Sequence, residues 1–100
     1  GTEDEAYLEA LADGLREAIA RTCPQLVIYI AGADPYVGDR LGRLRVSKRG
    51  LAARDELIYR YCRERELPVA ITMGGGYADD VHDIVDIHYQ SVMLAAQIFA

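Results

Sequence analysis

The sequence predicts an α/β fold in which helices flank a parallel sheet. Two short apolar runs rich in β-branched residues, 26–31 and 69–73, alternate with three stretches of helical periodicity. Strands that alternate with helices pair in parallel through right-handed crossovers, with helices on both faces of the sheet. The length of 100 residues, 51% of them hydrophobic and 27% charged, suits one small globular unit. Residues 1–100 are therefore expected to form a single unit with the order helix, strand, helix, strand, helix.

Residues 3–22 are predicted to form an amphipathic helix that leads into the first strand. Acidic residues stand at its start, where they interact favourably with the helix dipole. Its apolar face consists of Leu8, Leu11, Leu15, Ala18 and Ile19. Pro24 ends the helix, and the following run from Leu26 to Ala31 is continuously apolar, which is typical of a strand buried on both faces.

The remaining elements follow a long loop. Residues 32–47 contain three glycines and a proline without a sustained period, and loops of this length in small domains are usually functional. Ser47 is a candidate N-cap for a helix from Lys48 to about Glu66. The apolar face of this helix consists of Leu51, Ile58, Tyr61 and Cys62. Pro68 opens the second strand. A last helix, from about Ala78 to the end, aligns Val81, Ile84, Val85, His88, Val92, Ala95 and Phe99.

Two strands are few for a sheet of this kind. An average sheet has roughly five or six strands, and strands this apolar need cover on both faces and paired edges. We therefore expect further strands from a missing segment, or from a second copy of the chain, to complete the sheet.

Composition excludes several classes of function. The net charge of -5 disfavours nucleic-acid binding, which depends on clustered Lys and Arg. No apolar run approaches the roughly 18 residues of a membrane span, and the acidic start does not resemble a signal peptide. Cys23 and Cys62 lie far apart without a CxxC pair, which argues against both a disulfide framework and a thiolate zinc site. A cytoplasmic protein that binds neither nucleic acid nor membrane is expected.

Two loops are candidates for a functional site, because ligands of open parallel sheets bind beyond the carboxyl ends of the strands. Asp34 follows the first strand and is either a metal-ligating carboxylate or the opener of an Asx-type turn before Pro35. Gly74-Gly75-Gly76 follows the second strand. The glycine run lacks the lysine and the spacing of phosphate loops, so close backbone approach is the favoured interpretation. Tyr77 either donates its hydroxyl to an oxyanion or simply packs.

Other polar residues are predicted to be structural. Asp39 is expected to brace its loop. Asp86 and His88 spell Asp-x-His, but on a helix they point about 200° apart. His82 and Asp86 share a helix face, yet two groups are too few for a zinc site. His88 is expected to be a hydrogen-bonded core histidine, and neither serine lies in a nucleophile elbow.

Taken in order, these motifs resemble the histone deacetylase superfamily, and their sequences are most similar to bacterial and class IV-like members. The resemblance covers nearly the whole chain. Its motifs are Gly32-Ala33-Asp34, Gly38-Asp39-Arg40-Leu41-Gly42, Ser47, Gly50-Leu51, Arg54-Asp55-Glu56-Leu57, Pro68-Val69 and Gly74-Gly75-Gly76-Tyr77.

The resemblance implies an arginase-deacetylase type three-layer αβα fold, of which residues 1–100 would be the C-terminal part. It implies a zinc-dependent deacetylase that hydrolyses N-acetyl or other acyl amides, such as acetylated lysine or an acetylated amine. Asp34 would be a zinc ligand, Tyr77 the transition-state tyrosine, and Gly74, Gly75 and Gly76 the loop at the substrate. The family's tandem histidines and its Asp-x-His ligands have no match here. The chain alone is therefore expected to be inactive and to hold zinc weakly without the N-terminal half.

Two other hypotheses remain open. The chain is alternatively a stand-alone, non-catalytic interaction domain that self-associates or joins a partner chain, which would also cover the strand edges. A small-molecule or nucleotide binder at the glycine loop ranks last, because both the lysine and an acidic partner for ribose are missing.

Overall fold

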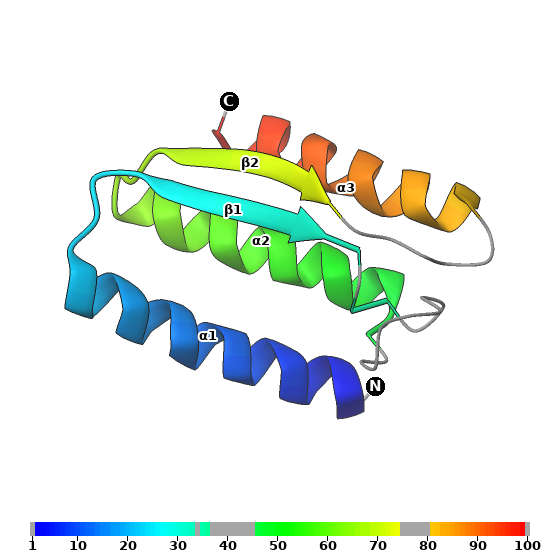
Figure 1. The fold of residues 1–100 in the computed structure, drawn as a ribbon, viewed down its shortest axis with the longest axis horizontal. Helices are drawn as coiled ribbons and strands as arrows, with labels where there is room; N and C mark the ends of the chain where they lie inside the picture. Colours follow the sequence, from blue (N-terminus) through cyan, green and yellow to red (C-terminus); the bar gives the residue numbers. More distant parts are fainter. Residues whose placement is uncertain (1, 34, 37–45, 75–80, 100) are drawn as a thin grey trace.

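The computed structural model describes residues 2–33, 35–36, 46–74 and 81–99 and confirms the predicted element order. Three helices and two strands alternate along the chain (Figure 1). Their bounds are α1 Thr2–Thr22, β1 Val27–Gly32, α2 Lys48–Glu64, β2 Val69–Gly74 and α3 Val81–Phe99. The helix and strand limits therefore lie within about three residues of those that the sequence predicts.

The two strands pair in parallel, as predicted. Val27 lies opposite Val69, and the register continues without a break to Gly32 opposite Gly74. The carboxyl ends of both strands consequently meet at one edge of the sheet. The segments that follow β1 and β2 both leave the sheet from this edge.

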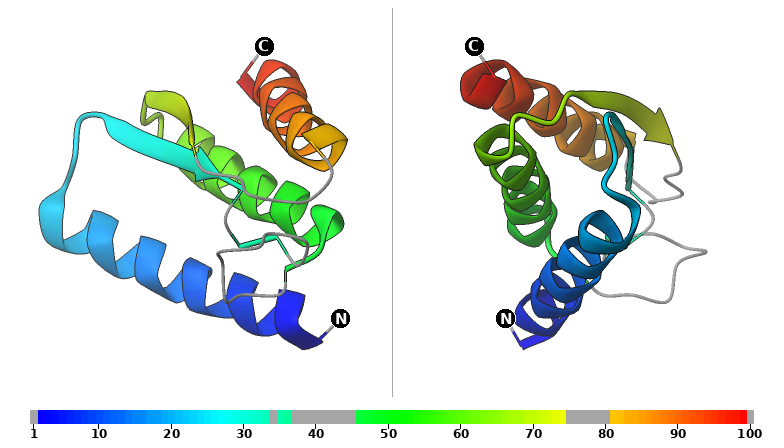
Figure 2. Two further views of the ribbon diagram at one scale, coloured as in Figure 1. Left: turned by 45° about the vertical axis from the view of Figure 1, so that its right-hand side comes forward. Right: turned by 90° about the vertical axis from the view of Figure 1, so that its left-hand side faces the viewer.

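The described helices cover only one face of the sheet. Tyr29 and Ala31 are buried against α2 and α3, whereas Ile28 and Ile30 on the opposite face are 67% and 68% exposed. Both helices lie behind the strands in Figure 1, and the rotated views in Figure 2 show them on the same side. The prediction of a strand buried on both faces is therefore wrong for the described chain, because no described element lies over Ile28 and Ile30.

The core consists of two clusters between the sheet and the helices. The larger cluster is built from Tyr29, Ala31, Ile58, Tyr59, Cys62 and Ile98. The smaller one, near the carboxyl edge of the sheet, is built from Ala33, Val46, Leu51 and Ile87. Within the larger cluster the Tyr59 ring packs edge-on against Tyr29, with ring centroids 5.8 Å apart. Aromatic pairs favour this arrangement over a face-to-face stack.

Helix α1 lies along α2 and contributes a half-buried face. Leu11 and Leu15 pack on the larger cluster, as predicted, but Ala18 is exposed. The helix ends at Thr22, and Cys23 adopts a left-handed φ of 46° while its N–H donates to the Ile19 carbonyl at 2.9 Å. This left-handed closure, followed by Pro24, gives the helix end that the sequence predicts.

Helix α3 packs through a face that matches the predicted stripe only in part, since Ala95 packs on the larger cluster and the Phe99 ring lies edge-on to Tyr59. Ile87, Ser91 and Ile98 are buried, whereas Val81, Val85 and Val92 of the predicted stripe are exposed. The helix is apolar on both sides, so the spacing of its apolar residues does not determine which side packs against α2. Among the described helices, none combines the length and the apolar character that a membrane span requires.

Candidate functional site at the carboxyl edge of the sheet

The predicted site residues follow directly from the carboxyl edge of the sheet. Gly74 is the last residue of β2 and pairs with Gly32 at the end of β1. Asp34, Asp39, Gly75, Gly76 and Tyr77 lie outside the described residues. The structure therefore shows the residues from which both loops leave the sheet.

The first loop begins and ends at a small, well-packed junction. Ala33 and Val46 are both 1% exposed and belong to the smaller core cluster. The Tyr36 N–H donates to the Ala33 carbonyl at 3.1 Å, and the Val46 N–H donates to the Pro35 carbonyl at 2.8 Å. Tyr36 and Val46 also form an isolated parallel bridge. The chain on either side of residues 37–45 is thus held together beside the end of β1.

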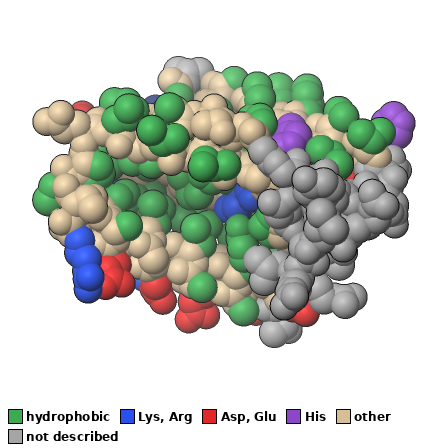
Figure 3. Space-filling view, viewed as in Figure 1, with side chains coloured by type: hydrophobic (Ala, Val, Ile, Leu, Met, Phe, Trp, Pro, Cys, Tyr) green, Lys and Arg blue, Asp and Glu red, His purple; other side chains and the backbone are tan. Residues whose placement is uncertain are grey.

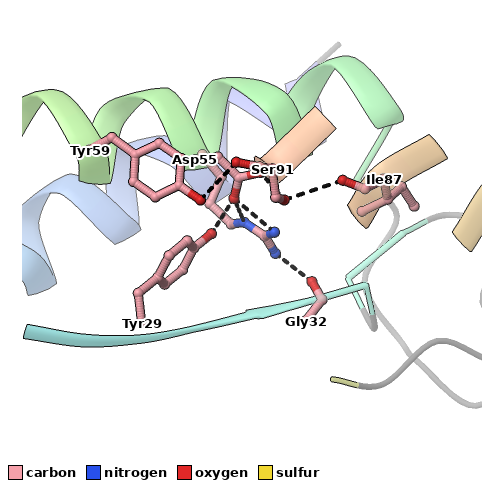
Figure 4. Close-up of polar contacts among 7 residues, drawn as sticks. Tyr29, Gly32, Asp55, Tyr59, Ile87 and Ser91 are labelled. Carbon is pink, nitrogen blue, oxygen red and sulfur yellow. Dashed lines mark hydrogen bonds and ion pairs between the residues drawn. The ribbon is translucent and has the colours of Figure 1, made fainter. Parts of the chain in front are cut away.

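A buried polar network holds the end of β1 against α2 (Figure 4). The Asp55 carboxylate accepts hydrogen bonds from the Tyr29 hydroxyl and the Ser91 hydroxyl. It also pairs with Arg54, whose Nε and Nη2 lie 3.0 and 2.9 Å from Asp55 Oδ1. Arg54 Nη1 in turn donates to the Gly32 carbonyl at 2.6 Å. An ion pair inside the core therefore anchors the backbone two residues before Asp34.

The network also joins α3 to the same anchor. The Tyr59 hydroxyl donates to the Ser91 carbonyl at 3.1 Å, and the Ser91 hydroxyl also contacts the Ile87 carbonyl at 3.2 Å. Burial raises the pKa of Tyr29 well above its usual value, so its hydroxyl stays protonated and remains a donor to Asp55.

Sequence reasoning missed the burial of Arg54 and Asp55, which are 3% and 1% exposed. A signal was present, because both lie three and four residues after Leu51, on the same face as Ile58 and Cys62. Charged residues inside an apolar helical stripe are rare unless they are paired.

A second anchor connects the start of α1 to the start of α2. Asp4 accepts hydrogen bonds from the Ser47 N–H, at 2.9 Å, and from the Ser47 hydroxyl. These bonds hold the pKa of Asp4 below its usual value. The Ser47 hydroxyl accepts from the Gly50 N–H at 2.9 Å, which confirms Ser47 as the N-cap. A Cβ at Gly50 would lie 2.6 Å from Asp4 Cγ, so this close approach requires glycine.

One carboxylate joins the starts of α2 and α3. Asp83 Oδ1 lies 2.6 Å from Lys48 Nζ, and the Tyr36 hydroxyl donates to Asp83 Oδ2 at 3.0 Å. The pKa of Asp83 is lowered, chiefly by its hydrogen bond with Lys48. Asp86 also pairs with Lys48, at 3.0 Å, which gives it a structural role. His88 departs from its prediction, because its Nδ1 is buried and has no hydrogen-bond partner in the described part of the chain.

A hollow of about 390 Å³ opens beside the end of β1. Hydrophobic side chains gather along the strands and in this region between the strands and α1 (Figure 3). Its walls come from α1, β1 and α2 and from Pro35, through Tyr7, Leu11, Tyr29, Ile30, Gly32, Pro35, Arg54 and Ile58. Residues that precede and follow Asp34 in the sequence, Gly32 and Pro35, therefore both line the hollow.

Metal-ligating side chains do not form a complete site within residues 2–33, 35–36, 46–74 and 81–99, where no group of three or more His, Cys, Asp or Glu residues comes together. Both cysteines are free thiols, as predicted. Cys23 is exposed and Cys62 is buried. In the sequence, Asp34 is the carboxylate that follows the end of β1 most closely.

This arrangement defines an α/β unit in which two loops leave neighbouring parallel strands at one edge, where such folds bind their ligands. A sequence profile described as histone deacetylase domain matches residues 1–92. The chain belongs to this family.

Relatives from two organisms support the assignment. An uncharacterized protein of Picosynechococcus is 43% identical over 88 residues, which cover 88% of this chain and 29% of the relative. Histone deacetylase 2 of Arabidopsis thaliana is 42% identical over 77 residues, which cover 77% of this chain and 20% of that protein. Histone deacetylase 6 of the same plant is 30% identical over 77 residues, which cover 77% of this chain and 16% of that protein. The chain thus spans less than a third of the length of each relative.

Proposed function

We propose that this chain is part of a zinc-dependent deacetylase that hydrolyses N-acetyl or related acyl amides, such as acetyl-lysine. The observation that carries the proposal is the parallel register that sets Gly32 opposite Gly74. Asp34 and Tyr77 follow these residues by two and three positions, so both loops depart from the same edge. Family membership supports the reaction class, because two of the relatives are named histone deacetylases.

The residues at this edge suit amide hydrolysis in different ways. The Asp34 carboxylate is a hard oxygen ligand of the kind that zinc sites combine with histidine. When bound, zinc would supply a Lewis acid for the amide carbonyl. The Tyr77 hydroxyl would donate a hydrogen bond to the carbonyl oxygen as negative charge develops on it. Gly74, Gly75 and Gly76 lack side chains, which lets an acyl amide approach the backbone closely.

The fit to zinc is partial. A catalytic zinc site needs about three protein ligands and one open position. The family resemblance assigns one ligand in this chain, Asp34, so we propose that the other ligands and the general base come from residues outside these 100. The chain alone would then neither hold zinc tightly nor hydrolyse an amide.

The test uses the complete protein that contains this chain, loaded with zinc and assayed on a fluorogenic acetyl-lysine peptide. Tyr77→Phe should lower kcat by roughly 100-fold while zinc remains bound, since one oxyanion donor contributes about that much. Asp34→Ala should lose zinc. Tyr89→Phe, which removes an exposed hydroxyl on α3, is the matched control and should leave kcat unchanged. Full activity of Tyr77→Phe would contradict the role assigned to Tyr77.

A second candidate function is a non-catalytic interaction domain, and one observation favours it. The sheet face that carries Ile28 and Ile30 is open and apolar, and such a face binds another protein surface readily. A second copy or a partner chain would cover it. A native mass equal to one chain in isolation would contradict self-association.

A further inference from the structure

Asp83 joins three described segments: the residues after β1, the start of α2 and the start of α3. It lies in the first turn of α3, six residues after Tyr77. Its Oδ2 accepts the hydrogen bond from Tyr36, at 3.0 Å, and its Oδ1 contacts Lys48 Nζ at 2.6 Å. Tyr36 lies two residues after Asp34, and Lys48 is the first residue of α2. One carboxylate therefore connects the chain after β1 with the helix after β2.

We propose that Tyr36 and Asp83 are positioning residues that set the placement of Asp34 relative to Tyr77. The inference rests on the proposed function. Both loops already share one fixed boundary, since Gly32 and Gly74 are paired in the sheet. The Tyr36–Asp83 hydrogen bond supplies a second fixed boundary beyond the two functional residues. A loop that is fixed on both sides has fewer conformations available to the residues between its anchors.

The surroundings make the Tyr36 hydroxyl a specific link. The Tyr36 ring packs on the smaller core cluster, and its backbone is held by Ala33 and Val46. Removal of the hydroxyl therefore leaves the ring and the backbone contacts of Tyr36 in place. The substitution removes the hydrogen bond to Asp83, which lies 47 residues further along the chain.

Asp86 provides a matched comparison within the same charge cluster. It pairs with Lys48 at 3.0 Å, and its side chain is 63% exposed. It lies one helical turn beyond Asp83, and it contacts Lys48 at the start of α2. Loss of Asp86 removes one ion pair of Lys48 and leaves the Tyr36–Asp83 bond intact. Exposed ion pairs of this kind contribute little to stability.

The expected effect is on the chemical step. Misplacement of a reacting group by about 1 Å lowers a rate by up to roughly 100-fold, so we expect kcat to fall by roughly 10- to 100-fold in Tyr36→Phe and in Asp83→Ala. Zinc content should be unchanged, because no ligand is altered. KM should change little, because neither side chain is proposed to bind the substrate.

The experiment measures kcat, KM and bound zinc in the complete zinc-loaded protein, with a fluorogenic acetyl-lysine peptide as the probe. Asp83→Asn keeps an oxygen that accepts from Tyr36, so it should retain more activity than Asp83→Ala. Asp86→Ala should match the unaltered protein. The double variant Tyr36→Phe/Asp83→Ala should be no slower than Asp83→Ala alone, because both changes remove the same bond.

The outcomes separate the inference from the proposed function. Thermal unfolding of each variant identifies the folded fraction, to which kcat is referred. If Tyr36→Phe lowers the melting temperature but keeps the kcat of the unaltered protein, the bond is merely structural and the inference is overturned. Equal losses in Asp86→Ala would overturn it as well. If the unaltered protein binds no zinc and does not turn over the peptide, the proposed function fails, and this inference fails with it.

Discussion

Replacement of Asp55 by Asn should destabilise the chain more than any other single isosteric change in the described core. The Asp55 carboxylate accepts from three donors: Tyr29, Ser91 and Arg54. The side chains of Arg54 and Asp55 are 4% and 1% exposed, so water does not replace a lost partner. Asn keeps the shape, removes the negative charge and replaces one of the two accepting oxygens by an NH₂ group, which donates.

The expected loss of unfolding free energy in Asp55→Asn follows from the Arg54 charge, which stays buried. Breaking a buried ion pair by removing one partner costs about 3–5 kcal/mol, because the other charge stays desolvated. A domain of this size has a free energy of unfolding of about 5–15 kcal/mol, so a large fraction of it would be lost. By comparison, Tyr29→Phe or Ser91→Ala removes one hydrogen bond to a charged group and should cost about 1.5–3 kcal/mol.

Urea denaturation followed by circular dichroism at 222 nm measures this difference. Asp55→Asn should lower the urea midpoint by roughly 1–5 M, given the usual dependence of unfolding free energy on urea. Glu56→Gln is the matched control, because Glu56 pairs with Arg60 on the exposed side of the same helix. It should change stability by no more than about 0.5 kcal/mol. An Asp55→Asn variant as stable as the control would refute the role of the buried pair.

Three further predictions concern other described contacts. Gly50→Ala should destabilise the chain by about 1–3 kcal/mol, because the new Cβ would lie 2.6 Å from Asp4 Cγ. Urea denaturation measures this loss, and unchanged stability would contradict the close approach of Asp4 to Gly50. Hydrogen bonds from Ser47 lower the pKa of Asp4 in the folded state. These bonds therefore stabilise the fold fully above the pKa of Asp4 in the unfolded chain, about 3.9. This stabilisation is lost as the pH falls through the lower pKa of the folded state. The urea midpoint of Asp4→Asn should therefore fall less than that of the unaltered chain between about pH 5 and pH 2, and parallel curves would argue against the bond. A thiol reagent should modify exposed Cys23 rapidly and buried Cys62, whose pKa is raised by burial, only after unfolding; two fast thiols in the native chain would contradict the burial of Cys62.

The element order and most boundaries were predictable because their signals are local. Pro24 and Pro68 interrupt the helical pattern, and Ser47 satisfies backbone N–H groups at the start of α2. Parallel pairing followed from the alternation of strands with helices, and it placed both candidate loops at one edge. These features depend on neighbouring residues or on general topology.

What the sequence did not predict depends on contacts between distant segments. The buried face of α3 is chosen by its contact with α2, which a helix that is apolar on both sides does not specify. The open face at Ile28 and Ile30 reflects which elements lie over the sheet, and the strand composition alone suggested cover on both sides. The bond between Tyr36 and Asp83 joins residues 47 positions apart, and no periodic pattern connects them.

The assignment of Asp34 and Tyr77 came from the family resemblance, with local chemistry leaving alternatives open. An Asp before Pro35 suits a turn as well as a metal, and a tyrosine after glycines suits packing as well as catalysis. Membership of the histone deacetylase domain family supports the catalytic interpretation, and both residues lie outside the described ranges. The variants Asp34→Ala and Tyr77→Phe test these roles directly.

The measurement that tests the central claim most directly is the zinc content per chain of these 100 residues, by elemental mass spectrometry after dialysis against zinc and then against metal-free buffer. The account predicts a value near zero, because one carboxylate at the sheet edge does not hold zinc without ligands from outside the chain. A value close to one zinc per chain would contradict it, since the site would then be complete within the chain or its oligomer.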